Sequence, residues 1–166
     1  ANVAYQRADA NSANVYAPGG TRRFDRVAFN GTYTAPSITP RNLQWNSTSG
    51  NWNATITNTP WLNTVGNVAT SFVQAGNQGD NVTFSNVAAG AVITIATGGV
   101  TPNSTTINNP NTLTFTGGNI GGTGALTKTG AGTLVLANSN TFAGGATISA
   151  GTVETQLQGS QAEVQR

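Results

Sequence analysis

The sequence predicts an all-β fold in which short strands stack as the coils of a solenoid, and three observations support this prediction. Between Gly117 and Val153, short apolar segments recur between Gly, Asn and Thr residues, which is the pattern of a solenoid and not of a sandwich. No segment shows the hydrophobic stripe and end caps of a helix. The chain has 21 Gly among 166 residues but only 7% charged residues, against about 25% in an ordinary soluble domain. We therefore expect short strands joined at glycine corners.

The expected strands follow one another at short intervals. Segments 25–29 and 80–84 share the pattern Asp-x-Val-x-Phe, and their starts are 55 residues apart (25 to 80), which corresponds to two coils of about 20 to 30 residues each. Further strands are expected at 91–95, 104–107 and 112–115 and in the glycine-rich block that follows. The side chains expected to point inward are Val82, Phe84, Ile93, Ile95, Leu113, Phe115, Leu126, Leu134, Leu136, Ile148 and Val153.

The solenoid is expected to occupy most of the chain. We place the solenoid domain at 25–153, an N-terminal arm or first coil at 1–24 and a C-terminal tail at 154–166. The N-terminal segment is either an ordered coil or an extended arm, and its pattern leaves both open. Consecutive Asn and Thr residues at the corners are expected to form hydrogen-bonded ladders from coil to coil.

The distribution of charge excludes several classes of function. The basic residues are Arg7, Arg22, Arg23, Arg26 and Arg41 near the N-terminus, followed only by Lys128 and Arg166. A nucleic-acid groove needs basic residues interleaved with aromatic ones along one face, so we expect no nucleic-acid partner. No apolar run approaches the ~20 residues of a membrane helix, so no membrane span is expected.

Catalysis and metal binding are also disfavoured. The chain has no His and no Cys, and its carboxylates are Asp9, Asp25, Asp80, Glu154 and Glu163. Imidazole bases, thiol nucleophiles and soft metal ligands are therefore absent, and the carboxylates lack the clustered spacing of a calcium site. We expect no enzyme activity, no cofactor and no metal site.

All three tryptophans, Trp45, Trp52 and Trp61, lie in one segment rich in Asn, Ser and Thr. Indole faces beside amide side chains are typical of carbohydrate sites, so one interpretation is a sugar-stacking platform. The other is that the rings fill or cap an open end of the solenoid, where a large amphipathic side chain closes the core. We favour the second interpretation.

The single lysine and the N-glycosylation sequons have simple explanations. Lys128 is the only lysine, and we expect it on the surface, paired across coils with Glu154. N-glycosylation sequons begin at Asn30, Asn46, Asn53, Asn81 and Asn103, and the abundance of Asn and Thr accounts for them.

The C-terminal block has a specific residue order. It reads GALTKTGAGTLVL over 124–136, NSNTFAGGATI over 138–148 and AGTV over 150–153. This order resembles the autotransporter-associated β-strand repeat, with Phe142 where the family has Tyr and Val153 where it has Leu. The resemblance implies a right-handed parallel β-helix on an exported bacterial protein, and it implies no catalytic residue.

Two function classes fit these observations. We expect a non-catalytic structural protein of the bacterial exterior that self-assembles head to tail into an extracellular filament, sheath or surface layer, because open solenoid ends and unpaired edges favour polymers. The alternative is a glycan-binding or adhesive module, such as a passenger stalk. An Ala at position 1 and the lack of Cys fit export to the cell surface or beyond. The candidate assembly residues are Val3, Tyr5, Val15, Tyr16, Arg22, Arg23, Arg26, Glu154, Leu157 and Glu163.

Overall fold

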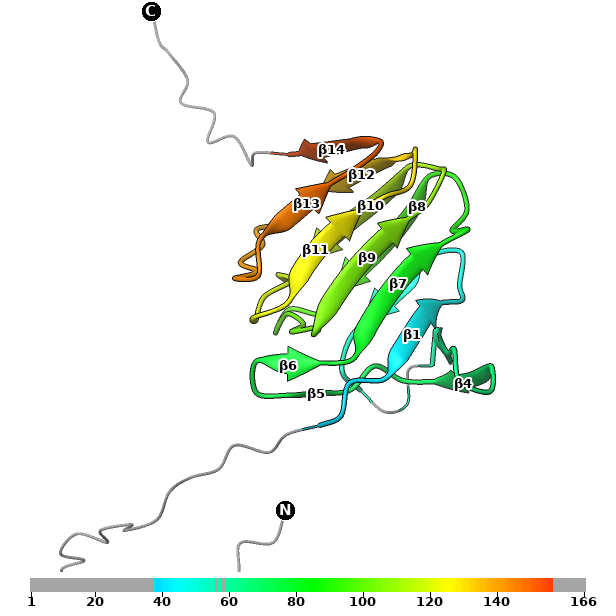
Figure 1. Cartoon of the computed structure of the whole chain (residues 1–166), viewed down its shortest axis with the longest axis vertical. Helices are drawn as coiled ribbons and strands as arrows, with labels where there is room; N and C mark the ends of the chain where they lie inside the picture. Colours follow the sequence, from blue (N-terminus) through cyan, green and yellow to red (C-terminus); the bar gives the residue numbers. More distant parts are fainter. Residues whose placement is uncertain (1–37, 56, 58, 157–166) are drawn as a thin grey trace, which may run out of the picture. The chain divides into compact units, whose positions relative to one another are not determined.

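The described part of the chain forms two stacked sheets and a small two-stranded one (Figure 1). The computed structural model describes residues 38–55, 57 and 59–156, and the regular elements in these ranges are all strands. The larger sheet has the order β13 (Ala146–Ile148), β11 (Ala125–Lys128), β9 (Ser104–Asn108), β7 (Asn81–Ser85), β1 (Asn42–Trp45), β3 (Trp61–Asn63), β4 (Val68–Thr70). The smaller sheet has the order β14 (Thr152–Thr155), β12 (Thr133–Leu136), β10 (Leu113–Gly117), β8 (Ala91–Ile95), β2 (Gly50–Trp52). The predicted β-solenoid is confirmed.

Each coil contributes one strand to each sheet. The pairs β1/β2, β7/β8, β9/β10, β11/β12 and β13/β14 lie at successive levels, and every level pairs in parallel with the next. Val82, Thr105, Leu126 and Ala146 lie opposite one another in the larger sheet, so the coils repeat after 23, 21 and 20 residues (82 to 105, 105 to 126, 126 to 146). These intervals agree with the predicted coil length of about 20 to 30 residues.

The core lies between the two sheets, and strand alternation decides which side chains enter it. Along Ala91–Ile95 every second side chain is buried and the others face outward. Nine of the eleven side chains predicted to point inward are buried, and Val153 is partly buried against the same cluster. Ile148 is 55% exposed. Ile148 lies in register with the buried Lys128 and so faces the inner side as predicted, but it stays exposed because β13 is the last strand of its sheet among the described residues.

Buried amides join the corners at which the chain passes from the larger to the smaller sheet. Asn109 is 1% exposed, and its Oδ1 accepts a hydrogen bond from the Val87 N–H at 2.8 Å. Asn111 Nδ2 donates to the carbonyl of the same Val87 at 2.9 Å. Corner backbone leaves the sheet ladders, so its polar groups need partners of this kind. Successive corners are therefore held together by side-chain hydrogen bonds.

An antiparallel insertion closes one end of the solenoid, and we call its strands β3 and β4 the cap hairpin. β3 pairs antiparallel with β1, placing Trp61 opposite Trp45, and β4 pairs antiparallel with β3. Gly66 and Asn67, with φ of 84° and 51°, form the turn between them. A short hairpin of β5 (Gln74–Ala75) and β6 (Gln78–Gly79) follows before β7 (Figure 1). The coils are parallel as predicted, and this insertion departs from that pattern.

Candidate functional site

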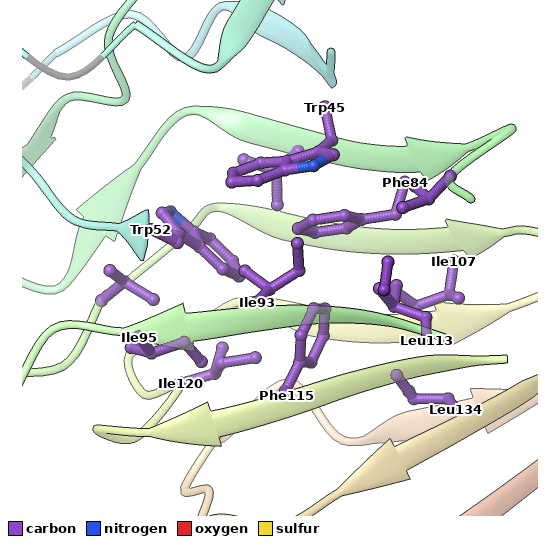
Figure 2. Close-up of a cluster of buried hydrophobic side chains, with 14 of the residues drawn as sticks. Trp45, Trp52, Phe84, Ile93, Ile95, Ile107, Leu113, Phe115, Ile120 and Leu134 are labelled. Carbon is purple, nitrogen blue, oxygen red and sulfur yellow. The ribbon is translucent and has the colours of Figure 1, made fainter. Parts of the chain in front are cut away.

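The three tryptophans form the closed end of the core, and Figure 2 shows two of them, Trp45 and Trp52, beside Phe84. Trp45, Trp52 and Trp61 are 2%, 0% and 1% exposed. Trp61 meets both others edge to face, with ring centroids 5.0 Å from Trp45 and 5.4 Å from Trp52. Phe84 stacks on Trp45 at 5.7 Å and contacts Phe115 at 5.0 Å, which carries the aromatic packing into the next coils. Such pairs contribute about 0.5 to 1.5 kcal/mol each beyond the area that they bury.

The position of the rings matches the cap interpretation. Phe72 packs on Trp52 with ring centroids 5.6 Å apart, so the cluster is covered on this side as well. The three indole N–H groups are buried without a hydrogen-bond partner, so ring packing holds these residues in place. A sugar-stacking platform needs an open indole face, and here the rings cover one another. Glycan binding by the tryptophans stays a prediction that requires the cap hairpin to open.

An ion pair fastens the cap hairpin to the coils. Asp80 is 1% exposed, and its carboxylate accepts hydrogen bonds from Arg41 Nε at 3.0 Å and Arg41 Nη2 at 2.6 Å. The carboxylate also accepts from the backbone N–H groups of Arg41 and Val73, both at 2.9 Å. The guanidinium donates to Thr70 Oγ1 at 3.1 Å and to the Ser71 carbonyl at 2.8 Å. The hydrogen bonds to Asp80 raise the pKa of Arg41, so the guanidinium stays charged. Asp80 therefore has a structural role.

Lys128 lies in the core, and the predicted surface pair with Glu154 is wrong. The Lys128 side chain is 0% exposed and lies opposite the buried Ile107 of the neighbouring strand. Its Nζ donates to the Gly130 carbonyl and, at 3.4 Å, to the Ala150 carbonyl. Burial lowers the pKa of Lys128. Glu154 is exposed on β14.

The outer face of the larger sheet carries uncharged side chains in register. One row across its strands consists of Gln44, Thr83, Thr106, Thr127 and Thr147. Along one margin, Asn81 Nδ2 donates to Asn42 Oδ1 at 3.0 Å, and Asn103 Nδ2 donates to Asn81 Oδ1 at 2.7 Å. Polar side chains therefore form the ladders that the sequence predicts. This face offers hydrogen-bonding groups and methyl groups to a partner, without charge.

We call the edges of β13 and β14, opposite the cap hairpin, the open end. Both are the last strands of their sheets among the described residues, and their side chains are largely exposed. A hollow of about 680 Å³ lies at this end, and its lining includes Asn119, Asn138, Asn140 and Thr155. The amides are largely engaged, since Asn138 Nδ2 donates to the Gly118 carbonyl and Asn140 Oδ1 accepts from a backbone N–H. The hollow is polar and uncharged.

Most candidate assembly residues lie outside the described residues. These are Val3, Tyr5, Val15, Tyr16, Arg22, Arg23, Arg26, Leu157 and Glu163, and the first copy of the predicted repeat at 25–29 lies outside as well. In the part of the chain that the structure describes, no three His, Cys, Asp or Glu side chains meet as a metal site. No helix in that part is long and apolar enough to cross a membrane. Assembly through these residues stays a prediction.

Comparison with known proteins agrees with the resemblance seen in the sequence. Residues 126–154 match the family described as the passenger-associated-transport-repeat. The adhesin BmaC autotransporter of Brucella suis biovar 1 (strain 1330) is 54% identical over 48 residues, which cover 29% of this chain and 1% of that protein. No solved structure was found to match. The two matches support an autotransporter passenger repeat and an exported, cell-surface protein, as predicted.

Proposed function

We propose that this chain is a non-catalytic structural part of a cell-surface protein, a passenger-type β-solenoid stalk with an adhesive role. The observation that carries the proposal is the difference between the two ends of the solenoid. The cap hairpin covers the aromatic cluster at one end, whereas at the other end β13 and β14 are the last strands of their sheets among the described residues. Coils that contact only their neighbours can be added at such an edge. The passenger repeat, and the adhesin that matches part of the chain, support the same role.

The chemistry of the described side chains supports a role without catalysis. Asp80 is held by Arg41 and Val73, and Glu154 stands on a different coil and a different sheet. General acid–base catalysis needs a proton-transfer group beside the reacting atoms, and glycoside hydrolysis needs two carboxyl groups at a defined separation. These two carboxylates do not face one substrate.

A retention assay tests the adhesive role. The purified full chain is applied to surfaces coated with glycans or matrix proteins and to cultured cells, and oligosaccharide cleavage is measured in parallel. We expect saturable retention without cleavage products. Thr106→Glu on the outer face of the larger sheet should weaken retention, whereas Thr114→Glu on the smaller sheet serves as the matched control. Retention no greater than that of the heat-unfolded chain contradicts the adhesive role, and product formation contradicts the non-catalytic one.

A second candidate function, self-assembly, is favoured by the placement of exposed apolar side chains. Among the described residues, the exposed large hydrophobic side chains are Val65, Val68, Val92 and Ile148. Three of these four belong to the cap hairpin or to the open end, and β4 and β13 are the two edges of the larger sheet. Free strand edges pair readily with other chains, and a contact between opposite ends is heterologous and propagates into a filament.

Light scattering tests self-assembly. The full chain is compared with forms that lack residues 1–20 or residues 155–166. We expect the full chain to form large species and at least one truncation to reduce them. A full chain that stays monomeric at high concentration contradicts self-assembly, and two truncated forms that polymerise unchanged contradict the participation of the terminal segments.

A further inference from the structure

The ammonium group of Lys128 lies inside the protein among backbone carbonyls. Lys128 occupies a position at which the neighbouring strand has Ile107, so an apolar side chain fits the same row. Its hydrogen bonds run from Nζ to the carbonyls of Gly130 and Ala150, and among the described residues no carboxylate pairs with it. Burying an ammonium costs free energy unless acceptors are placed to receive it. The carbonyls around Nζ are therefore the feature that makes a lysine acceptable here.

Three glycines shape the space around this ammonium. A Cβ on Gly151, whose φ is 73°, would lie 2.5 Å from both Lys128 Nζ and the Gly130 oxygen. A Cβ on Gly130 or Gly132 would overlap the backbone of the preceding corner. Only residues without a Cβ let the successive corners approach this closely. The close approach brings the carbonyls of two corners to one point.

We propose that this corner is a binding site for a primary ammonium group, which Lys128 fills from within the core and which joins the last coil to the coil before it. Gly130 follows β11 and Ala150 follows β13, so one ammonium bridges two coils. A primary ammonium has three N–H donors and no acceptor, which suits a site made of carbonyl oxygens. The site selects for N–H donors, because in the part of the chain that the structure describes no anionic side chain forms an ion pair with Nζ. This inference is independent of the adhesive role.

The preceding corner supports this assignment. There the buried Asn109 accepts from the Val87 N–H and donates through Nδ2 to the Asn111 carbonyl at 3.2 Å. Corners at successive levels thus each contain a buried polar side chain that satisfies backbone groups. The Asn109 amide, which can donate and accept, lies at the corner that offers both a backbone N–H and a carbonyl. The Lys128 ammonium, which only donates, lies at the corner where two carbonyls converge.

Chemical rescue of the full chain tests the site. Lys128→Ala removes the side chain beyond Cβ, a segment that n-propylammonium matches, whereas Lys128→Met keeps an apolar stem without donors. Hydrogen exchange of residues 142–156 is measured with n-propylammonium, tetramethylammonium or potassium chloride at equal concentration. We expect exchange to be about tenfold faster in both variants, since the carbonyls lose their donors. n-Propylammonium should restore protection in Lys128→Ala alone.

Two outcomes would overturn the proposal. One is a Lys128→Met protein whose last coil exchanges as slowly as in the wild type, because the ammonium is then dispensable. The other is equal rescue by tetramethylammonium, which has no N–H donor. If Lys128→Ala does not fold, acylation of the wild-type chain provides the test. Lys128 should react at least about tenfold more slowly in the folded chain than in the urea-unfolded chain, in step with exchange of the last coil. Equal rates in the folded and the unfolded chain would contradict a filled site.

Discussion

At the scale of single residues, the titration of Lys128 links its burial to stability. Burial lowers the pKa of Lys128 below the ordinary value of about 10.5 that applies in the unfolded chain. Between the two pKa values the unfolded chain binds more protons than the folded one, so the free energy of unfolding rises with pH across this window and levels off above it. We expect urea unfolding of the wild type to show this rise and Lys128→Met to lack it.

The comparison with Lys128→Met also serves as its own control. The other charged side chains of the described part are Arg41, Asp80 and Glu154, which belong to the cap ion pair and to the outer face of β14. They are present in both proteins, as are the tyrosines outside the described ranges. Their contributions to the pH dependence therefore cancel when the two unfolding free energies are subtracted. An identical pH dependence in the two proteins would show that Lys128 is solvated.

The cap tryptophans allow a prediction that separates ring packing from hydrogen bonding. Trp52 is fully buried and its indole N–H has no acceptor. Trp52→Ala should lower the free energy of unfolding by about 3 to 5 kcal/mol through the cavity that it leaves. Trp52→Phe should cost clearly less, because it keeps a ring and removes a donor that has no partner. Denaturant unfolding measures both, and equal costs would reveal a hydrogen bond to the indole.

Strand alternation explains what could be predicted at this scale and where the prediction failed. Leu126 and Lys128 are two residues apart on β11, so alternation places both on the inner face. The charge of Lys128 favoured a surface position, and the carbonyls of Gly130 and of Ala150, which lies on the next coil, make the inner position tolerable. Arg41 and Asp80 meet although 39 residues separate them. No short spacing in the sequence indicates such contacts.

At the scale of elements, the position of a strand in the stack should decide the cost of shortening its side chains. Leu134 on β12 is 0% exposed, between β10 and β14, whereas Ile148 on β13 is 55% exposed. Leu134→Ala should lower the free energy of unfolding by about 2 to 5 kcal/mol. Ile148→Ala should stay within about 0.5 kcal/mol if the chain is monomeric. Urea unfolding at low protein concentration measures both, and similar costs would indicate that Ile148 is covered in solution.

The Arg41–Asp80 pair links the cap hairpin to the coils, because Arg41 also donates to Thr70 and Ser71. Asp80→Asn preserves the size of the side chain but removes the charge that binds the guanidinium, and we expect a loss of about 1 to 3 kcal/mol. Glu154→Gln is the matched control, because Glu154 is exposed and should change stability little. Limited proteolysis should cut 53–80 faster in Asp80→Asn. Equal cleavage of the two variants would show that ring packing alone holds the cap hairpin.

The coil strands could be predicted and the cap hairpin could not, for a physical reason. Strands β7 and β10 alternate apolar and polar residues, so periodicity locates them. β3 and β4 have three residues each and pair antiparallel outside that period. The three tryptophans indicated a cap, but which strand they would cover depends on contacts between β1 and β3 that only the folded chain shows.

At the scale of the whole molecule, the solenoid carries its charge in few places and leaves its strand edges at the ends. The described charged side chains either pair, as Arg41 and Asp80 do, or lie inside, as Lys128 does, and Glu154 is exposed. Proteins that stay monomeric commonly place charge or proline on edge strands. β13 has neither among its residues Ala146–Ile148. Its edge is therefore the place where association would begin.

A point substitution can test whether association depends on this edge. Ile148→Lys places a charge on β13, an edge strand of the larger sheet as described, and Val92→Lys, also at an exposed apolar residue, places the same charge on β8, an interior strand of the smaller sheet. If chains add at the open end, Ile148→Lys should lower the mass seen by light scattering, because an edge lysine opposes strand addition. Val92→Lys should leave it unchanged. If both substitutions lower the mass equally, association depends on net charge and not on this edge. If neither lowers the mass, the contact does not involve β13.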